Sequence, residues 1–148
     1  MLTSSRSAAG DILGVVPLVM RTVRAEMRRF RGPSVSVPQW RALGYVHRHA
    51  GTSLSEAGEH LGLTLPATSR LMDGLVERKL VMRRRDPGDR RCVRLAASAR
   101  GRGLWLAARE FTQAALAERL SALRPGERAA VSRAMAILRQ VFASAGED

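Results

Sequence analysis

The sequence predicts a mainly α-helical fold of six helices with one small β-hairpin. Apolar residues recur at helical spacing through most of the 148-residue chain, and Gly or Pro residues interrupt the pattern between segments. Only residues 80–95 combine strand-forming residues with a strong turn signal at their centre. A chain of this length is expected to form one domain, or one domain with helical extensions.

The first helix is predicted to run from Asp11, a suitable N-cap, to Arg31. Pro17 lies early in this segment, so the helix either kinks there or starts later. Gly32-Pro33 is expected to end the helix, and residues 1–10, which are small and polar, are expected to be disordered. The apolar positions at helical spacing are Ile12, Val16, Val19, Val23, Met27 and Phe30.

Two shorter helices are predicted next. The second begins after Ser36, has Pro38 in its first turn and ends near Gly51. Ser53 is expected to cap the third helix, which ends at Leu61.

The fourth helix is the candidate recognition helix. Gly62 forms the turn before it, Thr64 is its expected N-cap, and Pro66 is tolerated in its first turn. Its polar first turn and a half is expected to stay outside the core, where short side chains can reach base edges and phosphates. These polar residues are Thr64, Thr68, Ser69 and Arg70, and the buried stripe is Leu71, Met72 and Leu75.

An arginine-rich hairpin follows the fourth helix directly. Residues 80–82 and 92–95 are the predicted strands, and Asp86-Pro87-Gly88-Asp89 is the turn between them. A helix that can enter the major groove, followed by a basic β-ribbon, is the arrangement of a winged helix-turn-helix. The basic residues gathered here are Arg78, Lys79, Arg83, Arg84, Arg85, Arg90, Arg91 and Arg94.

The last two helices are predicted from Ser98 onward, with Pro125-Gly126 between them. Residues 36–95 form the expected DNA-binding winged core of a single domain over residues 11–143. The terminal helical segments, 11–31 and 98–143, carry more apolar surface than this small core can cover. We therefore expect a homodimer that packs these segments together, which also suits the twofold symmetry of paired DNA half-sites.

Composition narrows the class of protein. A net charge of +12 and a pI of about 11.7 indicate a polyanionic partner, most often nucleic acid. No apolar run approaches the roughly 20 residues that cross a bilayer, and residues 1–11 lack the apolar core of a signal peptide, so we expect a cytoplasmic protein without a membrane partner. No nucleophile–base pair or glycine-rich phosphate loop is present, so neither an enzyme nor a cofactor is expected.

Several motifs, taken in order, resemble the MarR (multiple-antibiotic-resistance regulator) family of bacterial transcription factors over about residues 11–143. The Asp-x-Arg of the hairpin, Asp89 and Arg91, is the most specific of them. The motifs are Val37-Pro38-Gln39-Trp40, Leu54-Ser55-Glu56, Leu61-Gly62-Leu63, Thr68-Ser69-Arg70-Leu71-Met72-Asp73, Leu80-Val81, Asp86-Pro87-Gly88-Asp89-Arg90-Arg91 and the exit from Leu95 to Gly101.

The resemblance implies a homodimeric repressor of a palindromic operator that a small-molecule effector or an oxidant releases. It also implies that Arg91 enters the minor groove, where the negative potential is enhanced, and that Asp89 braces the wing by pairing with an arginine. Lys79 departs from the usual Gly after the recognition helix, and Gly74 replaces a longer residue. The expected DNA-contacting residues are Thr64, Pro66, Ala67, Thr68, Ser69, Arg70, Arg84, Asp89, Arg90 and Arg91.

Other residues leave alternatives open. Phe30, Trp40 and Tyr45 either line an effector pocket or belong to the core. Cys92 is either a redox sensor, with arginines favouring its thiolate, or a small strand residue. The three histidines show no clustered metal-ligand pattern, so no metal is expected. The charge alone also fits a sequence-independent architectural DNA-binding protein, or less well a winged protein-interaction module.

Overall fold

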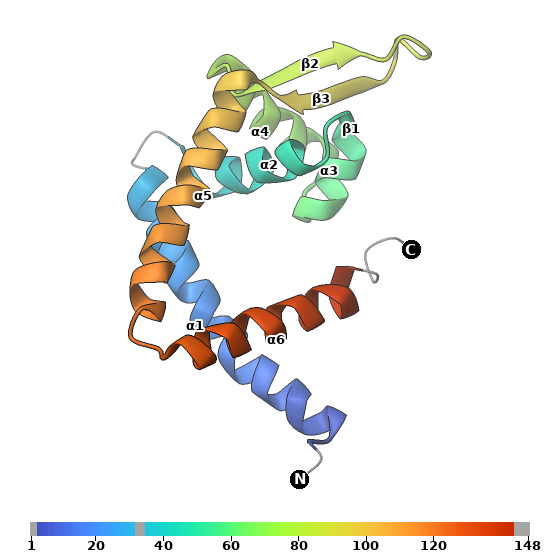
Figure 1. Ribbon diagram of the computed structural model, residues 1–148. Helices are drawn as coiled ribbons and strands as arrows, with labels where there is room; N and C mark the ends of the chain where they lie inside the picture. The colour runs from blue at the N-terminus through green and yellow to red at the C-terminus, as the bar shows by residue number, and fades with distance from the viewer. Residues whose placement is uncertain (1–2, 32–34, 144–148) are drawn as a thin grey trace. The chain divides into compact units, whose positions relative to one another are not determined.

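The computed structural model describes residues 3–31 and 35–143 as six α-helices and a three-stranded antiparallel sheet (Figure 1). The expected mainly α-helical winged fold is therefore confirmed. By internal contacts the chain divides into two units, Met1–Thr112 and Gln113–Asp148, and each is described by itself. The elements are α1 (Ser5–Arg31), α2 (Val37–Arg48), β1 (Thr52–Ser53), α3 (Leu54–Leu61), α4 (Leu65–Glu77), β2 (Val81–Arg85), β3 (Val93–Ala97), α5 (Ala99–Leu120) and α6 (Pro125–Ala143).

Helix α1 begins before its expected start at Asp11. The Ser4 hydroxyl accepts a hydrogen bond from the Ser7 backbone N–H at 3.1 Å, which satisfies one of the free donors of the first turn. The expected disorder of residues 1–10 is therefore wrong for Ser5–Gly10, which are helical. Pro17 lies inside the helix, and the expected stop at Gly32-Pro33 lies outside the described residues.

Reciprocal capping boxes open α2 and α3. In α2 the Gln39 N–H donates to the Ser36 hydroxyl at 3.2 Å, and the Ser36 N–H donates to the Gln39 side chain at 3.1 Å. Ser53 and Glu56 repeat this exchange at the start of α3. Helix α2 ends at Arg48, short of the expected Gly51, because Gly51 has a φ of 88° and leads into β1.

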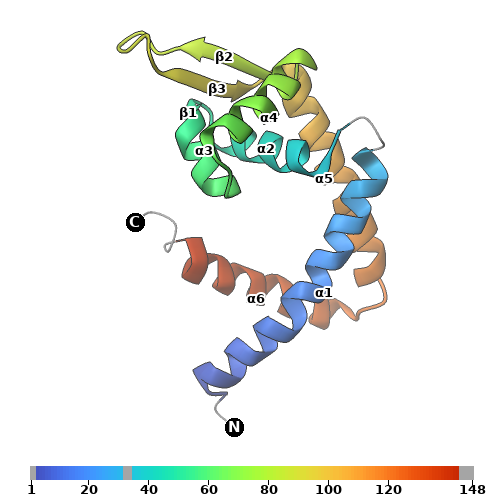
Figure 2. The same cartoon turned by 180° about the vertical axis from the view of Figure 1, so that it is seen from behind.

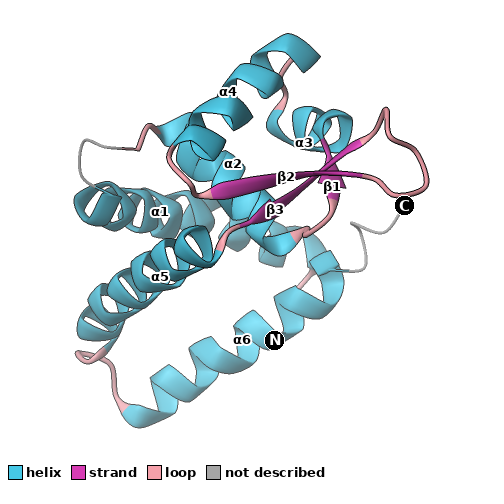
Figure 3. Cartoon of the chain, turned by 90° about the horizontal axis from the view of Figure 1, so that it is seen from above, coloured by secondary structure: helices cyan, strands magenta, loops and turns pink. Residues whose placement is uncertain are grey.

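The sheet has the order β1-β3-β2, and the residue pattern did not locate the short strand β1 at Thr52–Ser53. Strands β2 and β3 are longer than predicted and pair in register, with Arg83 opposite Leu95 and Arg84 opposite Arg94. The β2–β3 ribbon projects beyond the helical core with its turn at the tip (Figure 1). Seen from above, it lies beside α4 and α3 (Figure 3).

The core of the first unit lies where α2, α3 and α4 meet the base of the ribbon. Leu43, Met72, Leu75 and Leu95 are its largest fully buried apolar side chains. Burying their apolar surface is the main stabilising contribution to this core. The recognition helix thus sits on a fixed support that also holds the wing.

Helices α1 and α6 carry rows of exposed large apolar side chains. The N-terminal half of α1 extends beyond the α2–α4 core (Figure 2) and carries a row of exposed apolar residues. In the second unit, no described residue of α6 is buried. None of the described helices is long and apolar enough to cross a membrane. The rows include Leu13, Val15, Val16, Leu18 and Val19 on α1, and Val131, Met135, Ile137, Val141 and Phe142 on α6.

Candidate nucleic-acid interface

The N-terminal end of α4 is open to solvent. Gly62, with a φ of 69°, turns the chain from α3 into α4, and the Thr64 hydroxyl accepts a hydrogen bond from the Ala67 N–H at 3.3 Å. Short polar groups and free backbone donors therefore face outward at this helix end. All the expected DNA-contacting residues except Thr68 are partly or fully exposed: Thr64, Pro66, Ala67, Ser69, Arg70, Arg84, Asp89, Arg90 and Arg91.

Thr68 is not part of this exposed surface, so its expected position is wrong. Its side chain is fully buried, and its hydroxyl donates to the Thr64 carbonyl at 2.8 Å. A Cβ added to Gly58 would lie 2.8 Å from the Thr68 hydroxyl, so the residue packs α4 closely against α3. Helical spacing in the sequence could have predicted the burial of Thr68, because Thr68 shares a helix face with the buried Met72 and Leu75.

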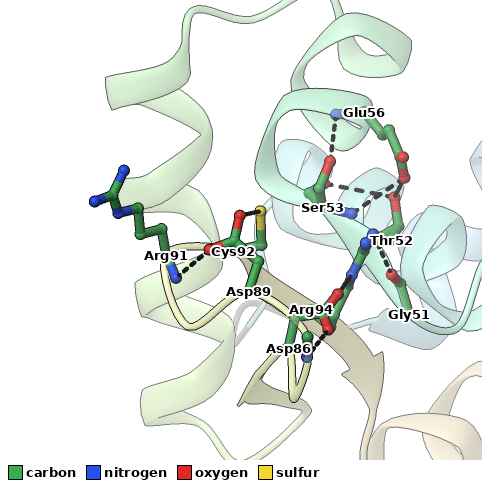
Figure 4. Close-up of polar contacts among 10 residues, drawn as sticks. Gly51, Thr52, Ser53, Glu56, Asp86, Asp89, Arg91, Cys92 and Arg94 are labelled. Carbon is green, nitrogen blue, oxygen red and sulfur yellow. Dashed lines mark hydrogen bonds and ion pairs between the residues drawn. The ribbon is translucent and has the colours of Figure 1, made fainter.

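A network of polar contacts holds the tip and base of the wing (Figure 4). The Asp86 carboxylate accepts from the Gly88 N–H at 2.8 Å and from Arg94 Nε at 3.0 Å, and Arg94 Nη1 donates to the Gly51 carbonyl at 3.4 Å. The Gly88 and Arg94 hydrogen bonds lower the pKa of Asp86, and Asp86 raises the pKa of Arg94. Both groups therefore stay charged near neutral pH.

Within the described part of the chain, Asp89 does not make the arginine ion pair that the family resemblance implies. It accepts instead from the Arg91 backbone N–H at 3.0 Å and from Cys92 Sγ at 3.5 Å. Asp86 forms the ion pair with an arginine instead. Asp86 directly follows β2, and the pairing of β2 with β3 brings Arg94 of β3 close to it. The Arg91 side chain points away from this network and is exposed (Figure 4).

The surroundings of Cys92 oppose a thiolate. The hydrogen bond to Asp89 and the charge of that carboxylate raise the pKa of the Cys92 thiol. The expectation that arginines favour its ionised form is therefore wrong, because an aspartate is the nearest charged partner.

The outer face of the ribbon carries unneutralised positive charge. Arg84 and Arg94 lie directly opposite each other, and like charges in this position repel. Asp86 balances Arg94, but among the described residues no carboxylate forms an ion pair with Arg84. A row of phosphates would supply the missing negative charge.

Two departures from the family pattern have visible consequences at α4. Lys79 has a φ of 60° and its N–H donates to the Val76 carbonyl, so it keeps the left-handed exit turn expected for glycine. The strain of such a residue is about 1 kcal/mol, and the Ser98 hydroxyl holds the Lys79 carbonyl at 2.6 Å. A Cβ on Gly74 would lie 2.8 Å from Gln39 Nε2, so Gly74 lets α2 approach α4.

A cavity of about 620 Å³ opens between α1, α2, α3 and α5 of the first unit. Of the three aromatic residues proposed for an effector pocket, only Trp40 lines it, and the buried Trp40 Nε1 has no hydrogen-bond partner among the described residues. Phe30 and Tyr45 do not line this cavity and take the other alternative, packing in or against the core. Phe30 packs against Phe111 at 5.5 Å between ring centroids, and Tyr45 stacks on two histidines.

Positive charge surrounds the aromatic wall of this cavity. Its charged or titratable lining residues are Arg24, Arg28, Arg41, Arg48 and His60, and no carboxylate lines it. Although His60 is exposed, desolvation by the neighbouring protein lowers its pKa, and the charges of Arg48, His49 and Arg41 lower it further. In the described ranges, no group of three His, Cys, Asp or Glu side chains could hold a metal ion.

The exposed end of α4 and the basic ribbon beside it define a winged helix-turn-helix protein. The model of the MarR family matches residues 34–91, from just before α2 to the tip of the wing. The match agrees with the family resemblance that the motifs predict over these residues.

Solved structures show the same fold over nearly the whole chain. RV1404 from Mycobacterium tuberculosis is 24% identical, with a TM-score of 0.76 and 95% of each chain covered. A MarR family protein from Bacillus stearothermophilus is 20% identical, with a TM-score of 0.76, over 95% of this chain and 99% of that one. FabT from Streptococcus pneumoniae, solved in complex with DNA, is 20% identical, with a TM-score of 0.58, over 94% and 95%. No curated protein sequence matches the chain.

Proposed function

We propose that this protein is a cytoplasmic, sequence-specific DNA-binding transcription regulator. The observation that carries the proposal is the exposed N-terminal end of α4 beside a wing whose outward Arg84 forms no ion pair with a carboxylate among the described residues. Such an end suits base edges in the major groove, and the Arg91 side chain suits the adjacent minor groove. The similarity to FabT, which was solved with DNA, supports the same partner.

The regulator acts as a homodimer on a palindromic operator and serves as a repressor. The exposed apolar rows of α1 and α6 need a partner surface, because contiguous apolar patches of this kind mark interaction sites. A second copy of the chain offers the same rows and brings a second recognition helix. Light scattering of the purified protein tests the dimer, and a monomer would contradict it.

Titration of DNA at several salt concentrations tests the function itself. A genome-wide footprint first supplies the operator, and a scrambled sequence of equal composition is the control. With about 6–10 phosphate contacts per dimer, the slope of log affinity against log salt should lie between about −5 and −9. The operator should bind at least about 10³-fold more tightly than the control at physiological salt.

A sequence-independent architectural protein is the second candidate, and the net charge of +12 is the observation that favours it. It shares the steep slope but binds operator and scrambled DNA equally. That result would replace the proposal with the architectural one. A slope shallower than about −2 would exclude DNA as the partner under either reading.

An effector that releases the DNA completes the proposal. The cavity joins an aromatic wall, an unpartnered Trp40 N–H and four arginines without a lining carboxylate, which suits an aromatic acid. Both tryptophans of the chain, Trp40 and Trp105, line it, so intrinsic tryptophan fluorescence reports on the cavity alone. Benzoate should quench this fluorescence and benzamide should not. Equal fluorescence quenching by benzoate and benzamide would contradict the proposed preference for a negatively charged effector.

A further inference from the structure

Arg83, one of the wing arginines, points inward and contacts the recognition helix α4. Arg83 Nη2 lies 2.6 Å from Asp73 Oδ1 and donates a hydrogen bond to the Ser69 carbonyl at 3.3 Å. Ser69 and Asp73 are one helical turn apart on α4. A single guanidinium on β2 therefore contacts two successive turns of the helix that bears the expected base-reading residues.

The strand pattern explains why Arg83 points this way. Side chains alternate between the two faces of a strand, so Arg83 shares a face with the buried Val81, while Arg84 lies on the outer face. Its cross-strand neighbour Leu95 is fully buried. The inward face of β2 thus continues from the core into the Arg83 contact with α4.

The Arg83–Asp73 contact adds little to the stability of the fold, but it links the wing directly to α4. The Arg83 and Asp73 side chains are 32% and 57% exposed, and ion pairs this open add little to the free energy of folding. The pair nevertheless joins two elements that the proposed function brings to DNA together, the recognition helix and the wing. Small displacements between such elements cost affinity, because both must fit neighbouring grooves at once.

We propose that the Arg83–Asp73 ion pair sets the angle between wing and recognition helix, and that both residues are positioning residues for operator recognition. The inference rests on the proposed DNA-binding function. Neither side chain needs to touch a base for this role. Arg83 influences DNA binding through its contact with α4, whereas the outward-facing wing arginines contact the DNA directly.

The sign of one charge change separates positioning from simple electrostatics. Asp73→Asn removes a negative charge from a helix that approaches a polyanion, so charge alone predicts tighter binding to any DNA. Positioning predicts the opposite for the operator, namely weaker binding, with scrambled DNA bound no more weakly than before. The two explanations therefore differ in direction.

The experiment compares Asp73→Asn, Arg83→Gln and the double variant on operator and scrambled DNA. We expect each single variant to weaken operator binding about tenfold, and the double variant to be no weaker, because both changes remove one interaction. Glu77→Gln is the matched control, since it removes an exposed carboxylate from α4 that forms no ion pair with Arg83. Circular dichroism melting curves show that the variants remain folded.

The charge-reversed pair, Asp73→Arg with Arg83→Asp, provides a rescue. It should recover most of the operator affinity that either reversal alone loses. The salt slope should remain that of the wild type in Asp73→Asn and Arg83→Gln. A slope less steep by about 0.9 for each lost contact in Arg83→Gln would make Arg83 a phosphate ligand and overturn the inference.

The outcomes also separate this inference from the proposed function. A wild-type protein without operator preference would remove both. A wild-type preference that Asp73→Asn leaves unchanged or raises, as Glu77→Gln should, would remove only the positioning role.

Discussion

Replacing Thr68 with valine tests the correction that the structure makes to the recognition helix. The Thr68 hydroxyl is buried and donates to the Thr64 carbonyl, which also accepts the Thr68 backbone N–H at 2.9 Å. Removing the hydroxyl therefore leaves no buried acceptor without a donor. Valine keeps the branched shape, so no cavity forms. The free energy of unfolding should fall by no more than about 0.5–1.5 kcal/mol, the net contribution of one hydrogen bond.

The same variant should leave DNA recognition intact. Operator affinity, measured by fluorescence anisotropy, should stay within about twofold of the wild type, because the side chain does not reach the surface. Arg70→Ala is the contrast, since that exposed side chain on the same helix should cost about 1–3 kcal/mol of binding free energy. Urea denaturation monitors folding in both variants. A large loss of operator affinity in Thr68→Val at wild-type stability would refute the buried placement and restore Thr68 to the interface.

Three further predictions concern the wing, the subunit contact and the cavity. Arg91→Ala should leave the melting temperature unchanged and weaken operator binding by about 1–3 kcal/mol per subunit; unchanged affinity in a gel-shift titration would contradict the minor-groove assignment. The double change Ile137→Asp and Val141→Asp places charge on the exposed apolar row of α6 and should convert dimers to monomers in light scattering, whereas Arg133→Asp should not. His60 should titrate by NMR below the ordinary histidine pKa of about 6.5. Because its folded-state pKa is lowered, protonation favours the unfolded chain, so stability should fall as the pH drops through about 6.5 and this loss should be smaller in His60→Gln.

Local signals explain why so much of the fold could be predicted. The side chains of Ser36, Ser53 and Thr64 each cap a helix by accepting a hydrogen bond from the backbone N–H three residues later. The starts of α2, α3 and α4 are therefore encoded within one helical turn. The start of α1 was missed because Ser4 and Asp11 are both good N-caps, and the sequence pattern does not rank them.

The site was less predictable, because it depends on contacts between segments that are distant in the sequence. Asp86 and Asp89 flank the same turn, and only the strand register brings Arg94 to Asp86. Trp40 and Tyr45 are five residues apart on one helix, a rotation of about 140°, so they could not line one cavity. The inward direction of Arg83 follows from strand alternation, but only once the register of β2 is known.

The facing pair Arg84 and Arg94 gives the free and bound forms of the wing opposite responses to ionic strength. In the free protein, salt screens the exposed charge of Arg84 more than the close, partly buried Asp86–Arg94 pair, so added salt should tighten the β2–β3 pairing and slow hydrogen exchange of its amides. On DNA, the phosphates already supply that screening, and the same salt drives the protein off. We therefore expect the wing to be more ordered in concentrated salt or on the surface of DNA than alone in dilute buffer.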